Sequence, residues 1–228
     1  MRWGNEHVFP VEAAFVGRQI DTVMKDIRAE VWVVGYMLQP ETIGCVVERA
    51  NHFSVPVVVL DPVMQTHAGQ TLLEPDAIEA LKLQLLPRCF MITPNLDEAE
   101  LLLQTEVRSL EQMKEAARAI YRMGSRYVLL KGGRRRDRRA SVDIFYDGGA
   151  FFELHAERVH THNTLGLGMT MASVVAAELA WSAHPLDAAK LAKRYITQIL
   201  LHAEDIVLGN GRGLLDHFLG QRPRIPEE

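Results

Sequence analysis

The residues best suited to chemistry lie in a glycine-rich turn that precedes a long apolar helix. Gly166 and Gly168 flank a single leucine, and a run of small and apolar residues begins at Met169. This pattern predicts a helix whose first backbone N–H groups have no partner within the helix. Such groups, together with the positive end of the helix dipole, attract phosphate or a developing anion, and glycine allows close approach. An ordinary glycine-containing connection into a core helix is the alternative that this turn alone leaves open.

Carboxylates follow two of the apolar runs that are typical of buried strands. Asp61 comes directly after VPVVVL, and Asn95 and Glu98 come after Cys89–Thr93. In a parallel sheet, ligands collect at the carboxyl ends of the strands. A carboxylate at that edge could hold Mg²⁺ through water near a nucleotide. Asn95 and Glu98 also have the spacing of a helix N-cap with its capping-box partner, and the two roles are compatible.

Basic residues follow the next expected strand. Lys131 stands beside Gly132 and Gly133, where it could touch phosphate or simply form a turn. The sequence RRRDRR at residues 134–139 is either a patch for phosphate or nucleic acid or a solvated loop between two strands. We favour the loop, since runs of charge are usually solvated.

Short apolar strands alternate with helices, which indicates a parallel sheet covered by helices on both faces. The expected strands are Val31–Gly35, Val55–Leu60, Cys89–Thr93 and Tyr127–Leu130, with an antiparallel pair at Val142–Tyr146 and Ala150–Leu154. The expected helices are Pro10–Arg28, Glu41–Phe53, a short helix from near Glu74, Leu110–Met123, the apolar helix after Gly168, and Leu186–His202. We expect the tail after Gly213 to be peripheral.

The composition predicts one soluble globular domain over residues 1–228, with no repeat or linker. The 228 residues are 48% hydrophobic and 24% charged, which is enough for a sizeable core. A net charge of −4 gives no reason to expect nucleic acid or an anionic membrane as a partner. Cys45 and Cys89 lack metal-ligand spacing and cannot form a disulfide framework. The sequence also has neither a secretory start nor an apolar run of about 20 residues. These features and the two unpaired cysteines favour a cytoplasmic location.

With these segments in order, the chain resembles the ribokinase superfamily and, within it, the hydroxymethylpyrimidine/phosphomethylpyrimidine kinases of thiamine biosynthesis. The resemblance extends from about Val8 to His217. The matching pieces are DPVM at Asp61, LLEPDA at Leu72, TPNLDEAELL at Thr93, KGG at Lys131, VDIFYDGG at Val142, and THNT with the two glycines and threonine that follow it, from Thr161. Several motifs in the same order are more specific than any one of them. The resemblance implies an α/β, three-layer αβα domain with a mainly parallel sheet and ATP at its carboxyl edge.

The resemblance also implies roles for individual residues. Asp61 and Glu98 would lie near Mg²⁺, through water, and Gly166 and Gly168 would belong to the anion hole. The residues implied on the nucleotide side are Asn95, Lys131, Gly132, Thr164 and Lys193. ATP and Mg²⁺ are the implied cofactors, and a small pyrimidine is the implied substrate.

The chain departs from the family pattern where the chemistry is expected. Met169 stands where these kinases carry a cysteine proposed as the base, and a thioether cannot act as a general base. Leu165 replaces a usual histidine, Leu167 a usual threonine, and Val34 and His67 usual lysines. The family's first strand and its pyrimidine-binding Gly-rich and Gln-Asn-Thr stretches are expected to be missing, since the sequence starts beyond them.

The sequence therefore predicts an ATP-dependent kinase of hydroxymethylpyrimidine phosphate in which the base for the free alcohol is lost. One alternative is a catalytically inactive remnant of this family that binds nucleotide or has a structural role. Another is a pyridoxal-type kinase of the same fold, which the combination of motifs disfavours. An open sheet edge beside the missing first strand also predicts pairing with another chain, and hence a homo-oligomer.

Overall fold

The structure, a computed structural model, describes residues 8–66, 69, 71–133, 140–203 and 213–219. Six strands form one sheet in the order β1-β2-β3-β4-β5-β6. Their bounds are β1 (Val31–Val34), β2 (Val57–Leu60), β3 (Met91–Ile92), β4 (Tyr127–Leu130), β5 (Ala140–Tyr146) and β6 (Phe151–Glu157). The first four strands are parallel, and β5 is antiparallel to both of its neighbours. The predicted mainly parallel sheet with an antiparallel hairpin is confirmed.

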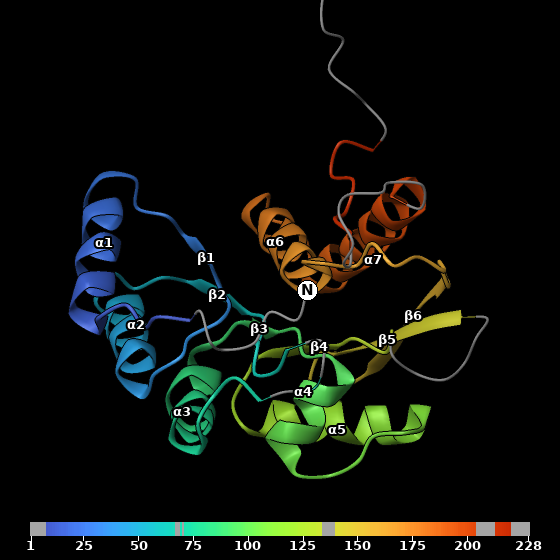
Figure 1. Cartoon of the computed structure of the whole chain (residues 1–228), viewed down its shortest axis with the longest axis horizontal. Coiled ribbons are helices and arrows are strands. Elements are labelled where there is room, and N and C mark those ends of the chain that lie inside the picture. The colour runs from blue at the N-terminus through green and yellow to red at the C-terminus, as the bar shows by residue number, and fades with distance from the viewer. Residues whose placement is uncertain (1–7, 67–68, 70, 134–139, 204–212, 220–228) are drawn as a thin grey trace, which may run out of the picture.

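Helices cover both faces of this sheet (Figure 1). One face carries α1 (Ala13–Asp26), α2 (Pro40–His52), α3 (Pro75–Ala80), α4 (Leu96–Leu103) and α5 (Leu110–Arg122). The opposite face carries α6 (Leu167–Ala180) and α7 (Pro185–His202). The helical stretch that starts at α3 continues through a π-helical segment, Leu81–Leu85, and a 3₁₀ turn, Leu86–Arg88. These layers are the αβα arrangement expected from the resemblance.

Alternating side chains of the strands feed two hydrophobic cores. In β2, Val58 and Leu60 belong to the core on the side of α1 to α5, and Val59 belongs to the core beneath α6 and α7. All three side chains are fully buried. The strand is therefore hydrophobic without interruption, because neither of its faces meets water.

The turn before α6 brings the helix N-terminus to the carboxyl edge of the sheet. Gly166 is the N-cap residue, with φ of 84°, a left-handed conformation that costs glycine little. Behind it, Ala172, Val175 and Ala176 pack in the same core as Val59. Small side chains on this face let the helix lie close to the sheet.

The first residues of the tail that was expected to be peripheral, Gly213–Leu215, pack against the loop that precedes α6, so the expectation was wrong for them; residues 220–228 lie outside the described part of the chain. Leu165 and Leu214 form a parallel bridge, and the Leu165 N–H donates to the Gly213 carbonyl at 3.3 Å. Leu215 is buried. The loop at Leu165 thus obtains a backbone hydrogen-bond partner from this segment.

Two expectations from the sequence concern contact with a membrane and with nucleic acid. Across the residues that the structure describes, no helix is both long and apolar enough to cross a membrane. The basic run at residues 134–139 and His67 lie outside the described residues. The structure therefore tests neither interpretation of the basic run.

Candidate active site

Asp61 is the buried carboxylate at the centre of the site. Only 2% of the residue is exposed. Lys131 Nζ donates to Asp61 Oδ1 at 2.6 Å, and Thr93 Oγ1 donates to the same oxygen at 3.2 Å. The three residues directly follow β2, β3 and β4, which are neighbours in the sheet. Parallel pairing of these strands therefore gathers residues that are up to 70 positions apart.

Gly168, in the first turn of α6, lies against this carboxylate and lysine. A methyl group on Gly168 would lie 2.8 Å from Asp61 Oδ2 and 3.1 Å from Lys131 Nζ. These distances are too short for an ordinary side chain, so the approach requires glycine. The Gly168 N–H belongs to the first turn, where backbone donors have no partner within the helix. The structure thus places the predicted anion-binding turn beside a cation and a carboxylate.

Asn95 and Glu98 form the capping box of α4 that their spacing predicts. Asn95 Oδ1 accepts the Glu98 N–H at 2.9 Å, and Glu98 Oε2 accepts the Asn95 N–H at 2.7 Å. Asn95 also forms a parallel bridge with Lys131, which brings the cap to the site. The cap therefore belongs to the same edge of the sheet as Asp61.

Burial changes the acidity of Glu98, of which 5% is exposed. Desolvation raises the pKa of this carboxyl to about 7, nearby Lys131 lowers the pKa, and Asp61 raises it further. The two carboxylates are therefore close enough to interact. Mg²⁺ is commonly held by one or two carboxylates and several waters, so this pair of residues fits a water-mediated site. The residues that the structure describes contain no cluster of three or more metal-binding side chains.

We predict that Glu98 makes the stability of the metal-free protein depend on pH. Its folded pKa of about 7 lies above the ordinary value of 4.5, so the folded state binds this proton more tightly than the unfolded state does. The contribution to the unfolding free energy is fully present below pH 4.5 and falls until the pH passes about 7. Urea unfolding in EDTA should show this fall in the difference between wild type and Glu98→Gln. Parallel pH profiles for the two proteins would contradict the assignment.

Lys193 lies on α7 and contacts residues of β5. Its Nζ donates to Asp143 Oδ2 at 2.7 Å and to Ser141 Oγ at 2.9 Å. The Gly132 N–H donates to the other oxygen of Asp143, Oδ1, at 2.8 Å. Asp143 was not among the site residues expected from the sequence. The available signal was an acidic residue inside an otherwise apolar strand, between Val142 and Ile144.

A pocket of about 570 Å³ lies beside Lys131, Gly168 and Lys193. This volume lies within the range of small-molecule sites, about 300–1,000 Å³. Six of the residues that line it are Asn95, Lys131, Asp143, Thr164, Gly168 and Lys193. Four of the five residues expected on the nucleotide side therefore line the pocket. The fifth, Gly132, directs its N–H to Asp143.

Met169 packs against the end of β1. A methyl group on Gly35, which directly follows β1, would lie 2.8 Å from Met169 Sδ. Met169 is half-buried there. The position that the resemblance gives to the base is thus next to Gly168 but is filled by an apolar side chain.

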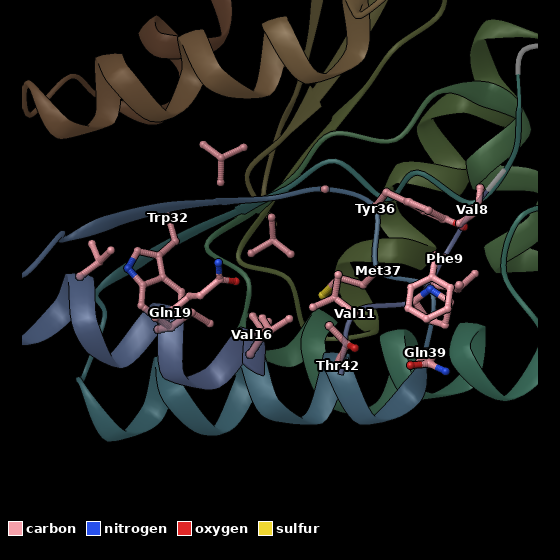
Figure 2. A pocket seen from close by; sticks show the side chains of 18 of the residues that line it. Val8, Phe9, Val11, Val16, Gln19, Trp32, Tyr36, Met37, Gln39 and Thr42 are labelled. Atoms are coloured by element: carbon pink, nitrogen blue, oxygen red, sulfur yellow. The ribbon is translucent and has the colours of Figure 1, made fainter. Parts of the chain in front are cut away.

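A second pocket, of about 810 Å³, lies between α1 and β1 (Figure 2). Val16 and Trp32 form parts of its wall, and Tyr36 and Met37 also line it. No charged side chain lines it among the described residues. The cationic groups that bind phosphate strongly, Lys131 and Lys193, line the other pocket.

Comparison with known proteins finds similarity to phosphomethylpyrimidine kinases. The family model described as phosphomethylpyrimidine kinase matches residues 2–216. The chain is 36% identical over 209 residues to hydroxymethylpyrimidine/phosphomethylpyrimidine kinase of Rhizobium meliloti, which covers 91% of this chain and 78% of the relative. It is 38% identical over 216 residues to a thiamine biosynthetic bifunctional enzyme of Arabidopsis thaliana, covering 94% of this chain. The chain spans only 41% of that bifunctional enzyme.

Solved structures with the same fold include a pyridoxal kinase and a phosphomethylpyrimidine kinase. Pyridoxal kinase from Staphylococcus aureus in complex with AMP-PCP superposes with a TM-score of 0.85 at 27% identity, covering 97% of this chain and 81% of that structure. Phosphomethylpyrimidine kinase from Clostridium difficile gives a TM-score of 0.72 at 29% identity, covering 86% of this chain and 80% of that structure. One kinase of this fold, the pyridoxal kinase, therefore binds an ATP analogue.

Proposed function

Because the chain belongs to the phosphomethylpyrimidine kinase family, we propose that it transfers the γ-phosphoryl group of ATP to hydroxymethylpyrimidine phosphate in thiamine biosynthesis. The observation that carries this proposal is the meeting of Asp61, Lys131 and Gly168 at the carboxyl edge of the sheet. A cation and free backbone N–H groups suit a transferring phosphoryl group, which carries negative charge on its oxygens.

In the proposed reaction, an oxygen of the substrate phosphate attacks the γ-phosphorus of ATP. A new P–O bond forms, the bond from the γ-phosphorus to the β–γ bridging oxygen breaks, and ADP leaves with that electron pair. Lys131 and the first-turn N–H groups of α6 would stabilise the negative charge during transfer. The pocket of about 570 Å³ would hold the nucleotide beside Asn95 and Thr164.

Asp61 and Glu98 are the residues that would hold Mg²⁺, through water. The bound ion would neutralise phosphate charge. Within the protein, Lys131 holds one oxygen of Asp61 in place, and the Asn95 N–H holds one oxygen of Glu98. These bonds fix the orientation of both carboxylates.

Met169 determines which acceptor the site can use. A free alcohol needs a base to remove a poorly acidic proton, and the thioether cannot supply one. The phosphate ester already carries negative charge near neutral pH. Positioning and electrostatic stabilisation are therefore sufficient for the ester, which we propose as the preferred acceptor.

The proposed function is tested by incubating the purified protein with ATP and Mg²⁺ and each candidate acceptor. We expect ADP release with hydroxymethylpyrimidine phosphate, much slower release with the free alcohol, and a pyrophosphate ester as the product. Pyridoxal is the third acceptor, because pyridoxal kinases superpose well on this chain. Faster turnover of pyridoxal would replace the pyrimidine assignment with the pyridoxal one.

We predict that nucleotide stabilises the protein whether or not transfer occurs. A ligand that binds only the folded state at a hundredfold excess over its Kd adds about 2.7 kcal/mol to the unfolding free energy. Thermal melts with and without ATP and Mg²⁺ measure this effect. A shift without turnover would favour the inactive nucleotide-binding alternative, and no shift at millimolar nucleotide would contradict the nucleotide site.

The predicted homo-oligomer would form at the free edge of β1. Within the described residues β1 pairs only with β2, and its sequence, VWVV, contains no charge or proline that would block edge pairing. Of the fourteen exposed large hydrophobic residues in the described part of the chain, eight lie between Val8 and Tyr36. Two copies related by a twofold axis could pair their β1 strands antiparallel, which would bury this surface on both.

We predict that sedimentation shows concentration-dependent association and that Val33→Lys weakens it. Val33 lies in the free edge strand and is 36% exposed, so lysine there opposes pairing. Leu83→Lys is the matched control, because Leu83 is an exposed hydrophobic residue outside this surface. A monomer at all concentrations, or an equal effect of both substitutions, would contradict pairing through β1.

A further inference from the structure

Asp143 and Lys193 form a buried ion pair in the wall of the proposed nucleotide pocket. Their Oδ2 and Nζ atoms are 2.7 Å apart, and only 3% and 7% of the two residues are exposed. The pair joins β5 to α7 across 50 sequence positions. The second carboxylate oxygen of Asp143 accepts the Gly132 N–H. One carboxylate therefore connects three segments of the chain.

The turn that Asp143 holds contains Lys131. On one side, the Lys131 N–H donates to the Pro94 carbonyl at 2.8 Å. On the other side, the next residue, Gly132, is bound to Asp143 and packs directly on β5, because a methyl group on Gly132 would overlap the Val142 carbonyl oxygen. The Lys131 side chain extends from this held backbone to Asp61. A shift of the turn would therefore change the distance between Lys131 and Asp61.

A contribution to the stability of the fold is a weak explanation for the presence of this ion pair. Removing two charges from water is costly, and apolar residues of similar volume are often at least as stabilising as a buried pair. A carboxylate does here what an apolar side chain cannot, since it accepts a backbone N–H and a lysine at the same time. The pair is thus suited to fixing the position of the turn.

We propose that Asp143 and Lys193 are positioning residues that act on the nucleotide through Lys131, a role that rests on the proposed function of the site. Lys193 orients the Asp143 carboxylate, Asp143 holds Gly132, and the held turn places Lys131 against Asp61. Lys193 has two acceptors within the protein, Asp143 and Ser141. It acts through these contacts rather than as a phosphate ligand.

The first test is a double-mutant cycle on ATP affinity, measured by calorimetry with Mg²⁺. We expect Asp143→Asn to weaken ATP binding by about 10- to 100-fold in the wild-type background. In the Lys131→Met background the same substitution should have little further effect, because the group that Asp143 positions is gone. An equal loss in both backgrounds would overturn the proposal. Glu153→Gln, which breaks an ion pair of 3.0 Å between β6 and Lys114 of α5, is the control and should leave affinity unchanged.

The second test separates positioning from direct phosphate binding and from misfolding. Lys193→Met alone leaves the Asp143 carboxylate buried without its cation, whereas Lys193→Met with Asp143→Asn removes both charges and keeps an acceptor for the Gly132 N–H. We expect the double variant to bind ATP more tightly than Lys193→Met and to melt at a higher temperature. No recovery of affinity despite recovered melting temperature would show that Lys193 binds phosphate directly and would overturn the proposal. If wild type binds ATP but transfers no phosphoryl group, the proposed function fails while these binding measurements still decide the positioning role.

Discussion

Replacing Lys131 by methionine is expected to lower the rate of phosphoryl transfer by about 10²–10³-fold, the loss typical when one stabilising donor is removed from a charged transition state. Lys131 Nζ is 2.6 Å from Asp61 Oδ1 and lies beside Gly168. The substitution also leaves a buried carboxylate without its cation. It should therefore lower the unfolding free energy by about 3–5 kcal/mol. Steady-state kinetics and urea unfolding of the same preparation measure both losses.

The double variant Lys131→Met with Asp61→Asn separates these two effects. It removes both charges of the Asp61–Lys131 pair, so neither is left buried without its partner, and we expect most of the lost stability to return. The rate should stay low, because neither residue can take its part in transfer. Recovery of rate together with stability would show that the pair has only a structural role and would contradict its place in the active site.

Replacing Met169 by cysteine is expected to raise turnover of the free alcohol far more than turnover of the phosphate ester. A positioned base typically contributes about 10²–10⁴-fold, and a thiol can exchange a proton where a thioether cannot. The shorter side chain also vacates space beside Gly35, which Met169 Sδ now contacts. Met169→Ala vacates that space without adding a base, and so serves as the control.

The role of Met169 is tested by measuring the turnover of the free alcohol and of the phosphate ester by each variant. An increase for the alcohol that appears equally with alanine would mean that space, not acid–base chemistry, limits the reaction. Equal rates on the alcohol and the phosphate ester in the unchanged protein would contradict the proposed acceptor preference. In either case the assignment of Met169 to the position of the missing base would fail.

The sequence predicts the fold well because strands covered by helices on both faces are uninterrupted apolar runs, which are visible in the sequence. Tyr127–Leu130 is predicted with the bounds that β4 has, since its apolar run ends sharply at Lys131. The strand predicted at Cys89–Thr93 is longer than β3, which contains only Met91 and Ile92. Hydrogen bonds from Phe90 and Thr93 to β2 residues nonetheless continue on either side of it. The packing of Leu214 could not be expected, because its partner, Leu165, lies about 50 positions away and leaves no local pattern.

The sequence predicts only those site residues that directly follow a buried strand. Asp61 and Lys131 each follow a buried strand, so a shared edge could be expected, but their direct contact depends on the strand order. The ion pair of Asp143 with Lys193 could not be predicted, since it joins a strand to a helix of the opposite layer. The roles in nucleotide and Mg²⁺ binding, the cytoplasmic location and the absence of nucleic acid as a partner stay predictions.

The most direct test of the central claim is single-turnover transfer from ATP that is labelled in its γ-phosphate. The protein is mixed in excess over the labelled ATP, with Mg²⁺ and saturating hydroxymethylpyrimidine phosphate. Our account predicts that the label moves to the pyrimidine product in the wild-type protein and that Lys131→Met with Asp61→Asn slows this transfer at least about 10²-fold. Label that stays in ATP bound to the wild type, or that moves equally fast in the double variant, would contradict it.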